Sequence, residues 1–492
     1  MSKMTRILLA LGLILAVATP ALAEFKLNGY YRLMGYSAEV RSGAATVEGG
    51  YAADTKDEEG DSRQMIDQRL RMMLTYSLND NVSIVYHGEI DTVWGETSKG
   101  NIGGGGKLGS DGVNVETKNV YLDLKSGGTS ARLGIQTIAD SYQGIAFFDD
   151  MAGVNFTHKM GNTTLNLAYS KWDEGTSSNS RSNYDDSDLY VADIKQKFND
   201  NFTVGASVYF LQDNTQEDLA TAAGLACIDA NANNKCDAGE TVIVPTAAGA
   251  AGSSLNARES ELYYYGLNAA VKFGNFGIDG FFLMMDGEND YLNKADNDIE
   301  AYAASAKVNM KLGNGDVGLR AMYFSDDDDA KDDGAWRTPT GRYDFVNDNL
   351  MQFLTDKFIC NYGKERYAMA DAAEAGYGLL GLVASGNHKL PADMYLNWGA
   401  GYFRALEDER NGGAKHIDNR EGKTLGWEVA ARVGKKFFEK VDVSLNGSYA
   451  DYGDFYDYTS TGLSFNTDGS VKTLGDDPDA TYKAYLMVNV PF

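Results

Sequence analysis

The sequence predicts an all-β fold, a transmembrane antiparallel β-barrel of about eighteen strands. Two observations lead to this prediction. Alternate positions at the C-terminus share an apolar face, namely Tyr482, Ala484, Leu486, Val488, Val490 and Phe492. Short polar turns and long loops also follow one another along the chain. A strand with one apolar and one wetter face is typical of a membrane-spanning barrel strand.

The N-terminus has the features of a secretory signal peptide. Lys3 and Arg6 precede an apolar run at 7–17, and Ala21-Leu22-Ala23 supplies a small-residue cleavage site. We expect residues 1–23 to be removed and residues 24–492 to form the mature barrel. The apolar run is too short for a membrane anchor.

Charge and hydropathy narrow the class of protein. The formal net charge of −26 argues against nucleic acid as a partner. After residue 23, no apolar run reaches the length of a membrane-spanning helix. The mean hydropathy of the whole chain is −0.35. A barrel has such a value because every second residue of a strand faces water.

The rhythm of turns gives the strand number. Asn, Asp and Gly are frequent in eight short turns, at 79–81, 126–129, 161–162, 199–201, 274–275, 313–315, 386–391 and 438–440. Eight turns between two single terminal strands predict eighteen strands, with both ends on the short-turn, periplasmic side. Sixteen strands remain an alternative, and the alternation is least regular at 378–384.

A soluble β-sandwich is the competing fold. It needs a dry interior of large side chains, whereas charged residues lie on the non-lipid face, among them Arg69, Arg71, Arg132, Lys307 and Arg432. Such a density of charge predicts a wet lumen. We also expect Trp94, Trp172, Trp398 and Trp427 to lie in aromatic belts at the membrane interfaces.

Residues 103–161 carry a resemblance to a known family. The segments concerned are Asp111–Asp123, Arg132–Thr137 and Phe148–Val154. They resemble the trimeric outer-membrane porins of sulfate-reducing bacteria. Elsewhere the resemblance rests on the strand rhythm and the two termini. The terminal Phe492 is similar to the C-terminal aromatic residue that is read as an assembly signal in outer-membrane barrels.

The resemblance implies a homotrimer in the outer membrane of a Gram-negative bacterium, with a water-filled channel for passive diffusion of small hydrophilic solutes and ions. It also implies that the third outer loop, at 139–151, folds inward as a constriction. The residues implied at this narrowing or on the wall are Asp140, Tyr142, Gln143, Asp149, Asp150, Arg32, Arg69, Arg71 and Arg132. An acidic loop facing a basic wall disfavours bulky uncharged solutes. Alternatively, the loop carboxylates pair with the wall arginines and fix the loop.

The long outer loop at 213–259 contains a pattern of oxygen ligands. The residues at the ligand positions of a twelve-residue calcium loop are Asp229, Asn231, Asn233, Lys235, Asp237 and Glu240. We expect a structural Ca²⁺ there, with Lys235 contributing its backbone carbonyl. A polar surface loop that binds no metal is the alternative, because Asn234 replaces the usual glycine. Cys227 and Cys236 are expected to form a disulfide.

No motif for catalysis is present. The four histidines show no metal-ligand spacing, and no nucleophile elbow, P-loop or zinc-protease motif occurs. The sequence therefore predicts a protein that is not an enzyme. A membrane hydrolase that uses a serine of the lumen or rim is a weaker alternative, because a catalytic triad need not be contiguous in the sequence. The acidic outer loop at 325–375 contains Cys360, to which no role is assigned. A surface-interaction or structural barrel with calcium-ordered outer loops is the alternative function.

Overall fold

The computed structural model describes residues 24–40, 61–95, 103–109, 113, 115–174, 186–214, 226–227, 242–243, 259–290, 297–327, 334–336, 338–339, 372–373, 376–408, 418–420, 422–456, 458–460 and 480–492. The predicted signal peptide, the six calcium ligands, Cys236 and Cys360 lie outside these residues, as does the side chain of Cys227. No helix in the described part of the chain is long and apolar enough to cross a membrane.

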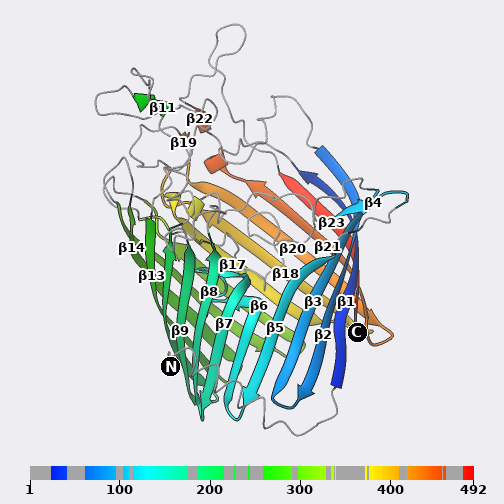
Figure 1. Cartoon of the computed structure of the whole chain (residues 1–492). Helices are drawn as coiled ribbons and strands as arrows, with labels where there is room; N and C mark the ends of the chain where they lie inside the picture. Colours follow the sequence, from blue (N-terminus) through cyan, green and yellow to red (C-terminus); the bar gives the residue numbers. More distant parts are fainter. Residues whose placement is uncertain are drawn as a thin grey trace.

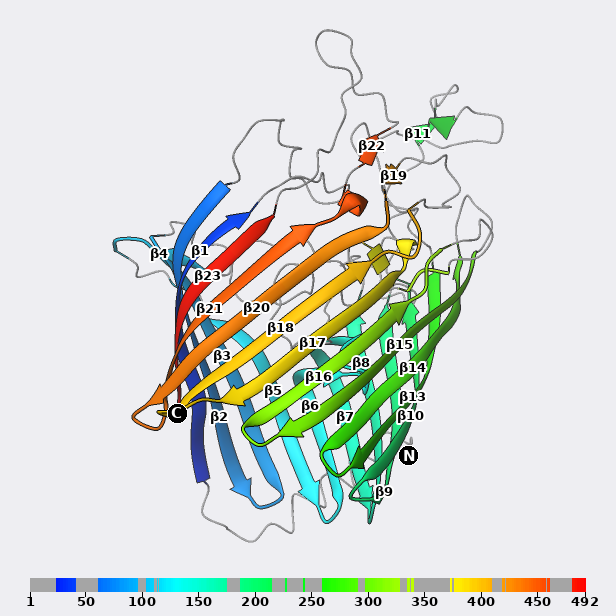
Figure 2. The same cartoon turned by 180° about the vertical axis from the view of Figure 1, so that it is seen from behind.

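Neighbouring antiparallel strands form one closed barrel (Figures 1 and 2). The strands are β1 (Glu24–Val40), β2 (Asp61–Asn79), β3 (Val82–Trp94), β5 (Glu116–Ser126), β6 (Thr129–Ala139), β7 (Phe148–Met160), β8 (Thr163–Asp173), β9 (Ser187–Asn199), β10 (Phe202–Asp213), β13 (Glu259–Phe273), β14 (Phe276–Asp290), β15 (Asn297–Leu312), β16 (Gly315–Phe324), β17 (Leu379–Lys389), β18 (Met394–Arg404), β20 (Thr424–Phe437), β21 (Val441–Tyr452) and β23 (Thr481–Pro491). These are eighteen strands, and the predicted number is confirmed.

Smaller elements lie outside this cycle. The short β4 (Gly103–Gly106) adds to β3 in parallel. Two further pairs are β11 (Ala226–Cys227) with β12 (Val242–Ile243), and β19 (Asp418–Arg420) with β22 (Tyr458–Ser460). A 3-10 helix spans Asp454–Tyr456.

The first and last strands close the barrel. β1 pairs with β2 on one side and with β23 on the other. Beside this seam, the backbone N–H groups of Gly29 and Phe492 each donate to the carbonyl oxygen of the other residue, both at 3.0 Å. Closure removes the unpaired sheet edges that would otherwise expose backbone hydrogen-bonding groups.

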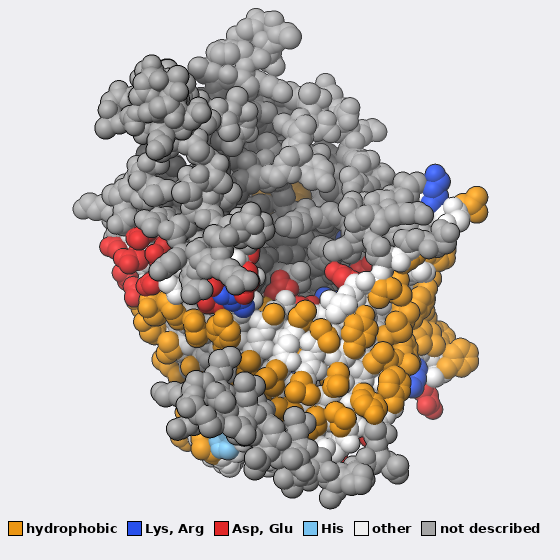
Figure 3. Space-filling model, in the orientation of Figure 1, with side chains coloured by type: hydrophobic (Ala, Val, Ile, Leu, Met, Phe, Trp, Pro, Cys, Tyr) orange, Lys and Arg blue, Asp and Glu red, His pale blue; other side chains and the backbone are white. Residues whose placement is uncertain are grey.

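Successive side chains of each strand point to opposite faces of the barrel wall, and the two faces have different surroundings. Large apolar side chains are exposed at every second position of the wall, for example at Val208, Leu267, Phe282 and Leu445. On the face seen in Figure 3, apolar side chains form a band across the outside of the barrel. The intervening side chains face the lumen. This arrangement suits a wall between lipid and an inner compartment.

Two local predictions are corrected. The seventh short turn lies at 390–393 and not at 386–391, because β17 extends to Lys389 and pairs with β18 from Leu380 to Lys389. Trp172 is not part of an outer aromatic belt. It shares the inward face of β8 with Ser170, and its indole N–H contacts the Met151 sulfur at 3.0 Å.

The lumen is not wet throughout, contrary to the sequence expectation. A large cluster of buried apolar side chains occupies the inner side of the strands from β6 to β20. It also includes residues of the third loop, of the loops that follow β16 and β18, and of the 3-10 helix. Each strand contributes between one and three such residues, for example Tyr209, Tyr264, Leu283 and Phe324. The apolar content of a single strand is therefore small, and barrel closure is what brings these side chains together.

Candidate functional site

The third outer loop, residues 140–147, is shorter than predicted and folds around one carboxylate. Asp140 Oδ1 accepts the backbone N–H groups of Tyr142 and Gly144 at 2.7 and 2.9 Å. Its Oδ2 accepts those of Ala146 and Phe147 at 2.6 and 3.0 Å. Gln143 and Gly144 adopt positive φ angles of 70° and 79°, which allows the chain to turn within this tight loop. Asp140 therefore fixes the shape of the third loop.

Burial also changes the acidity of this group. Asp140 is only 8 % exposed. Desolvation raises the pKa of its carboxyl group to about 6, while the four backbone N–H donors act in the opposite direction.

The third loop packs against the wall made by β9, β10, β13 and β14. The fully buried Tyr142 donates its hydroxyl to Ser207 Oγ at 2.8 Å and meets the Phe281 ring edge-on at 5.6 Å. Ser141 Oγ donates to Asp193 at 3.0 Å. Gly266 allows this approach, since a Cβ there would overlap the Tyr142 side chain. The loop is thus fastened to this wall by side chains of several strands.

A second segment enters the barrel from the loop between β16 and β17. We call it the Trp336 segment, residues 334–336 and 338. Trp336 Nε1 and Thr338 Oγ1 both donate to the carbonyl oxygen of Ile145, at 3.3 and 2.7 Å. The Trp336 ring meets Tyr264 edge-on at 5.8 Å. The third loop and the Trp336 segment therefore hold each other in place inside the apolar half of the lumen.

The opposite wall, on β1, β2 and β3, is charged. Arg69 binds Asp91 with two hydrogen bonds, of 2.7 Å from Nε to Oδ1 and 2.6 Å from Nη2 to Oδ2. Arg69 Nη2 also lies 3.3 Å from Glu89, and Arg71 Nε binds the same carboxylate. Arg32 lies directly opposite Arg69 in the β1–β2 register. Planar bidentate pairs of this kind hold both partners in a defined orientation.

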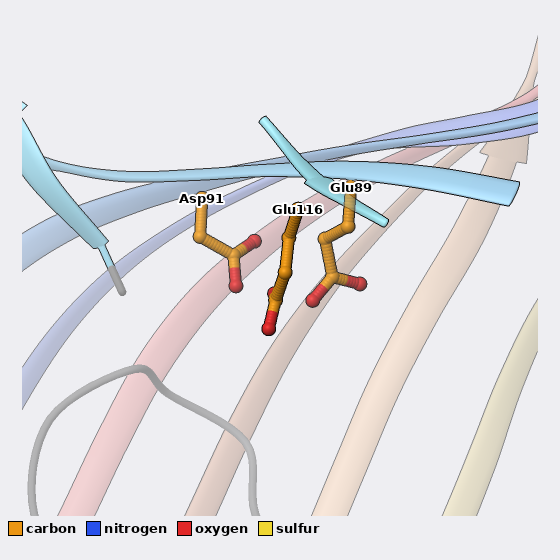
Figure 4. A group of neighbouring side chains, drawn as sticks. All are labelled: Glu89, Asp91 and Glu116. Carbon is orange, nitrogen blue, oxygen red and sulfur yellow. The ribbon is translucent and has the colours of Figure 1, made fainter. Parts of the chain in front are cut away.

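Three carboxylates on this wall approach one another closely enough to share a cation. Oxygens of Glu89, Asp91 and Glu116 lie within 4.8 Å of one another (Figure 4). Because Arg69 and Arg71 already bind Glu89 and Asp91, their negative charge is compensated without a metal. We therefore interpret the group as part of an ion-pair network rather than as a metal centre.

The structure separates the predicted basic wall into two parts. Arg132 pairs in register with Asp123, and Asp123 with Ser83, whereas Arg69 pairs with Asp91. Eight residues on β3 therefore separate the two levels, a distance of about 26 Å along the strand. The Arg132 side chain is 46 % exposed within the lumen, with its guanidinium 5.3 Å from the centre of the Tyr121 ring. Arg132 thus lies nearer the short turns than Arg32, Arg69 and Arg71.

The predicted loop acids also separate. β7 begins at Phe148, so Asp149 and Asp150 belong to the sheet, opposite Ile138 and Thr137. Asp149 shares the inward face with Met151. Asp150 shares the outward face with Val154, and it binds Thr137 Oγ1 at 2.7 Å and Lys118 Nζ at 2.9 Å. Among the predicted loop acids, Asp149 is the one placed on the lumen face of a strand.

Two anchors of the third loop were absent from the sequence-based set. Asp193 binds Ser141, Ser207 and Tyr209. It stands at an inward position of β9, so alternation alone assigns its face but gives no indication of its partners. Trp336 lies in a loop, where no periodic pattern marks an inward side chain.

Comparisons with known proteins agree with this architecture. No family model and no curated protein sequence matches the chain. Solved structures of outer-membrane proteins do. Pseudomonas aeruginosa OccK2 (OpdF) has a TM-score of 0.53 and 11 % identity, with 95 % of this chain and 98 % of that chain covered. A BenF-like porin from Pseudomonas fluorescens Pf-5 gives the same four values. Acinetobacter baumannii OccAB1 has a TM-score of 0.50 and 13 % identity, over 95 % of this chain and 96 % of that one.

This likeness establishes the fold. The chain has the barrel architecture of Gram-negative outer-membrane porins along nearly its whole length. The compared structures come from Pseudomonas and Acinetobacter, so the finer resemblance to porins of sulfate-reducing bacteria stays a prediction.

Proposed function

We propose that the protein is a porin of the Gram-negative outer membrane, a channel for passive diffusion of small hydrophilic solutes and ions in which nothing is chemically changed. The observation that carries the proposal is the internal asymmetry of a closed barrel. A charged wall around Arg69 and Asp91 faces two loop segments that fill the opposite half of the lumen. A charged wall of this kind requires water beside it or pairing within it.

Several features support an open path along the charged wall. Arg132 keeps nearly half of its side chain exposed although it lies inside the barrel. The third loop has its contacts on β9, β10 and β14 and in the Trp336 segment, away from the charged wall on β1, β2 and β3. We infer that Arg32, Arg69, Arg71, Arg132 and Asp149 border the solute path, whereas Asp140, Tyr142 and Gln143 determine how far the loop extends into it. Charged groups lining a narrow aqueous path determine which solutes pass.

Recording of purified protein in planar lipid bilayers tests the proposal. We expect large, stable conductance steps. A variant in which residues 141–147 are replaced by Gly-Ser-Gly should give larger steps, because the loop no longer reaches β10 and β14. A membrane-inserted, folded wild-type protein that conducts no ions would refute the porin function.

Two finer proposals accompany the porin function. A homotrimer follows from the resemblance and predicts conductance increments in groups of three, with a trimer mass by light scattering in detergent. A structural Ca²⁺ in the loop at 213–259 predicts calcium-dependent heat in calorimetry of the whole protein, and loss of that heat in the E240Q variant. A monomeric mass or the absence of such heat would remove the respective proposal.

A further inference from the structure

Lysines recur at one equivalent position of the barrel, the last inward-facing position of a strand before the short turn. Six of them donate their backbone N–H to a carbonyl oxygen in the preceding short turn, at 2.7–2.9 Å; they are Lys125, Lys159, Lys197, Lys272, Lys311 and Lys389. Lys26 of β1 and Lys436 of β20 stand at comparable ends of their strands. We refer to these eight residues as the lysine collar. The short turns next to these lysines form the lower edge of the barrel in Figure 1.

Strand alternation gives the direction of these side chains. Lys272 shares a face with the buried Tyr264, Lys311 with Ala301, and Lys389 with Val383. All eight lysines are exposed to solvent. They therefore surround the opening of the lumen at the short-turn end.

The neighbouring residues show that the lysines do not face lipid. An apolar residue directly follows the lysine in several strands, in the pairs Lys197-Phe198, Lys272-Phe273, Lys311-Leu312 and Lys436-Phe437. These apolar side chains point outward and are exposed, Phe273 by 63 %. The outer edge of this end thus suits the membrane interface, and the inner edge carries the positive charge.

Much of this charge is uncompensated. Lys26, Lys125 and Lys197 have ion-pair partners in Glu24, Asp123 and Asp200. The other five have no carboxylate within 4.0 Å among the residues that the structure describes; they are Lys159, Lys272, Lys311, Lys389 and Lys436.

The two carboxylates nearest to the uncompensated lysines in the sheet register are held by other partners. Asp316 lies opposite Lys311 and accepts from Asn387 Nδ2 at 3.0 Å. Asp442 lies opposite Lys436 and accepts from the Tyr395 hydroxyl at 2.8 Å. Both carboxylates keep their negative charge. Lys159, Lys272 and Lys389, in contrast, have Thr164, Gly277 and Tyr395 opposite them in the sheet register, so no carboxylate faces these three lysines there.

We propose that the lysine collar binds multivalent anionic solutes at the short-turn mouth and makes the channel favour anions there. This inference rests on the proposed porin function. A ring of like charges at the end of a low-dielectric tube concentrates counter-ions at the opening. Anionic solutes fit the collar better than lipid headgroups do, because its ammonium groups lie on the lumen side and the outward positions are apolar.

The experiment uses the purified whole protein in planar bilayers, with inositol hexakisphosphate as the anionic probe. Added to each side in turn, the probe should reduce the current from one side only. The triple variant K272Q/K311Q/K389Q should weaken this block by about tenfold, and its reversal potential in a salt gradient should move towards cation preference. The triple variant K272R/K311R/K389R keeps the charge and should keep the block.

A matched control comes from the same end of the barrel. Lys435 precedes Lys436 but points outward, with its Nζ 5.6 Å from the centre of the Phe437 ring. The K435Q variant should leave the block unchanged. Equal block from both sides, or an unchanged block in the glutamine triple variant, would overturn the collar. Absence of any wild-type conductance would instead overturn the porin function.

Discussion

The indole Nε1 of Trp336 lies 3.3 Å from the carbonyl oxygen of Ile145, although 191 positions separate the two residues in the chain. Ile145 belongs to the third loop, and Trp336 to the loop between β16 and β17. Neither segment forms a helix or a strand in its described residues. Their mutual contact, and the apolar side chains around it, turn two loops into one fixed partition of the barrel.

Replacement of Trp336 by alanine should loosen this partition. The side chain is fully buried, so its loss should lower the free energy of unfolding by about 3–5 kcal/mol. The third loop also loses one of its two hydrogen bonds from the Trp336 segment, and single-channel current should become larger and noisier. Urea unfolding followed by gel mobility, together with bilayer recording, measures both effects.

The control for this prediction is Trp427, which has the same side chain on the outward face of β20 and is 40 % exposed. The W427A variant should leave current noise at the wild-type level. Quiet channels in the W336A variant would contradict the role of the partition.

Asp140 gives the protein a pH-dependent stability with a definite sign. Its folded-state pKa of about 6 lies above the ordinary aspartate value of 3.8, so the folded state binds the proton more tightly than the unfolded chain does. The contribution of this group to stability is therefore largest below pH 4 and is lost as the pH rises through about 6, by about 2–3 kcal/mol in total. Unfolding measured between pH 4 and pH 7 should show this loss.

The D140N variant supplies the comparison, because it cannot titrate. Its free energy of unfolding should lack this component between pH 4 and pH 7. Identical pH profiles for the wild type and the variant would show that the Asp140 pKa is not raised.

Strands and turns were predictable because their signals are local. Lys272-Phe273-Gly274-Asn275 shows this in four residues: an inward charge, an outward aromatic and a tight turn, in which Gly274 has a φ of 57°. Period-two alternation and turn chemistry require only neighbours in the sequence. The strand number and the inward position of the wall arginines followed from such signals.

The packing inside the apolar half of the lumen was not predictable, because its contacts join residues that are far apart in the sequence. The inward side chains that bury Tyr142 come from strands more than sixty residues further along the chain, such as Ser207 and Phe281. Asp149 and Asp150 look like loop residues because they are acidic, and only pairing with β6 places them in a strand. The candidate site therefore depends on which distant residues the barrel brings together.

The buried ion pairs of Arg69 with Asp91 and Glu89 are predicted to contribute more to the free energy of unfolding than any exposed ion pair does. In the R69A variant, Asp91 and Glu89 remain buried with less compensation, and the free energy of unfolding should fall by about 3–5 kcal/mol. The double variant R69M/D91L removes both charges and should lose less. Denaturant unfolding of the wild type, the R69A variant and the R69M/D91L variant measures these differences.

The exposed Arg132 is the matched control within the lumen. Its pair with Asp123 is long, at 3.8 Å, and the R132A variant should lose only about 0–1 kcal/mol. A greater loss for R132A than for R69A would contradict the assignment of the bidentate pair as the stabilising one.

Deletion of Phe492 should impair assembly more than conductance. Its backbone exchanges two hydrogen bonds of 3.0 Å with Gly29 beside the β1–β23 seam, so the truncated chain closes its barrel with two fewer bonds at the end of the last strand. The level of folded protein in the outer membrane should fall severalfold, measured by quantitative blotting of membrane fractions, while the channels that do insert keep wild-type conductance. The F25A variant removes an exposed aromatic side chain from the same end of β1 and should leave the level unchanged, because no backbone bond is lost. A truncated protein at normal membrane levels would mean that closure of the seam does not depend on the terminal residue.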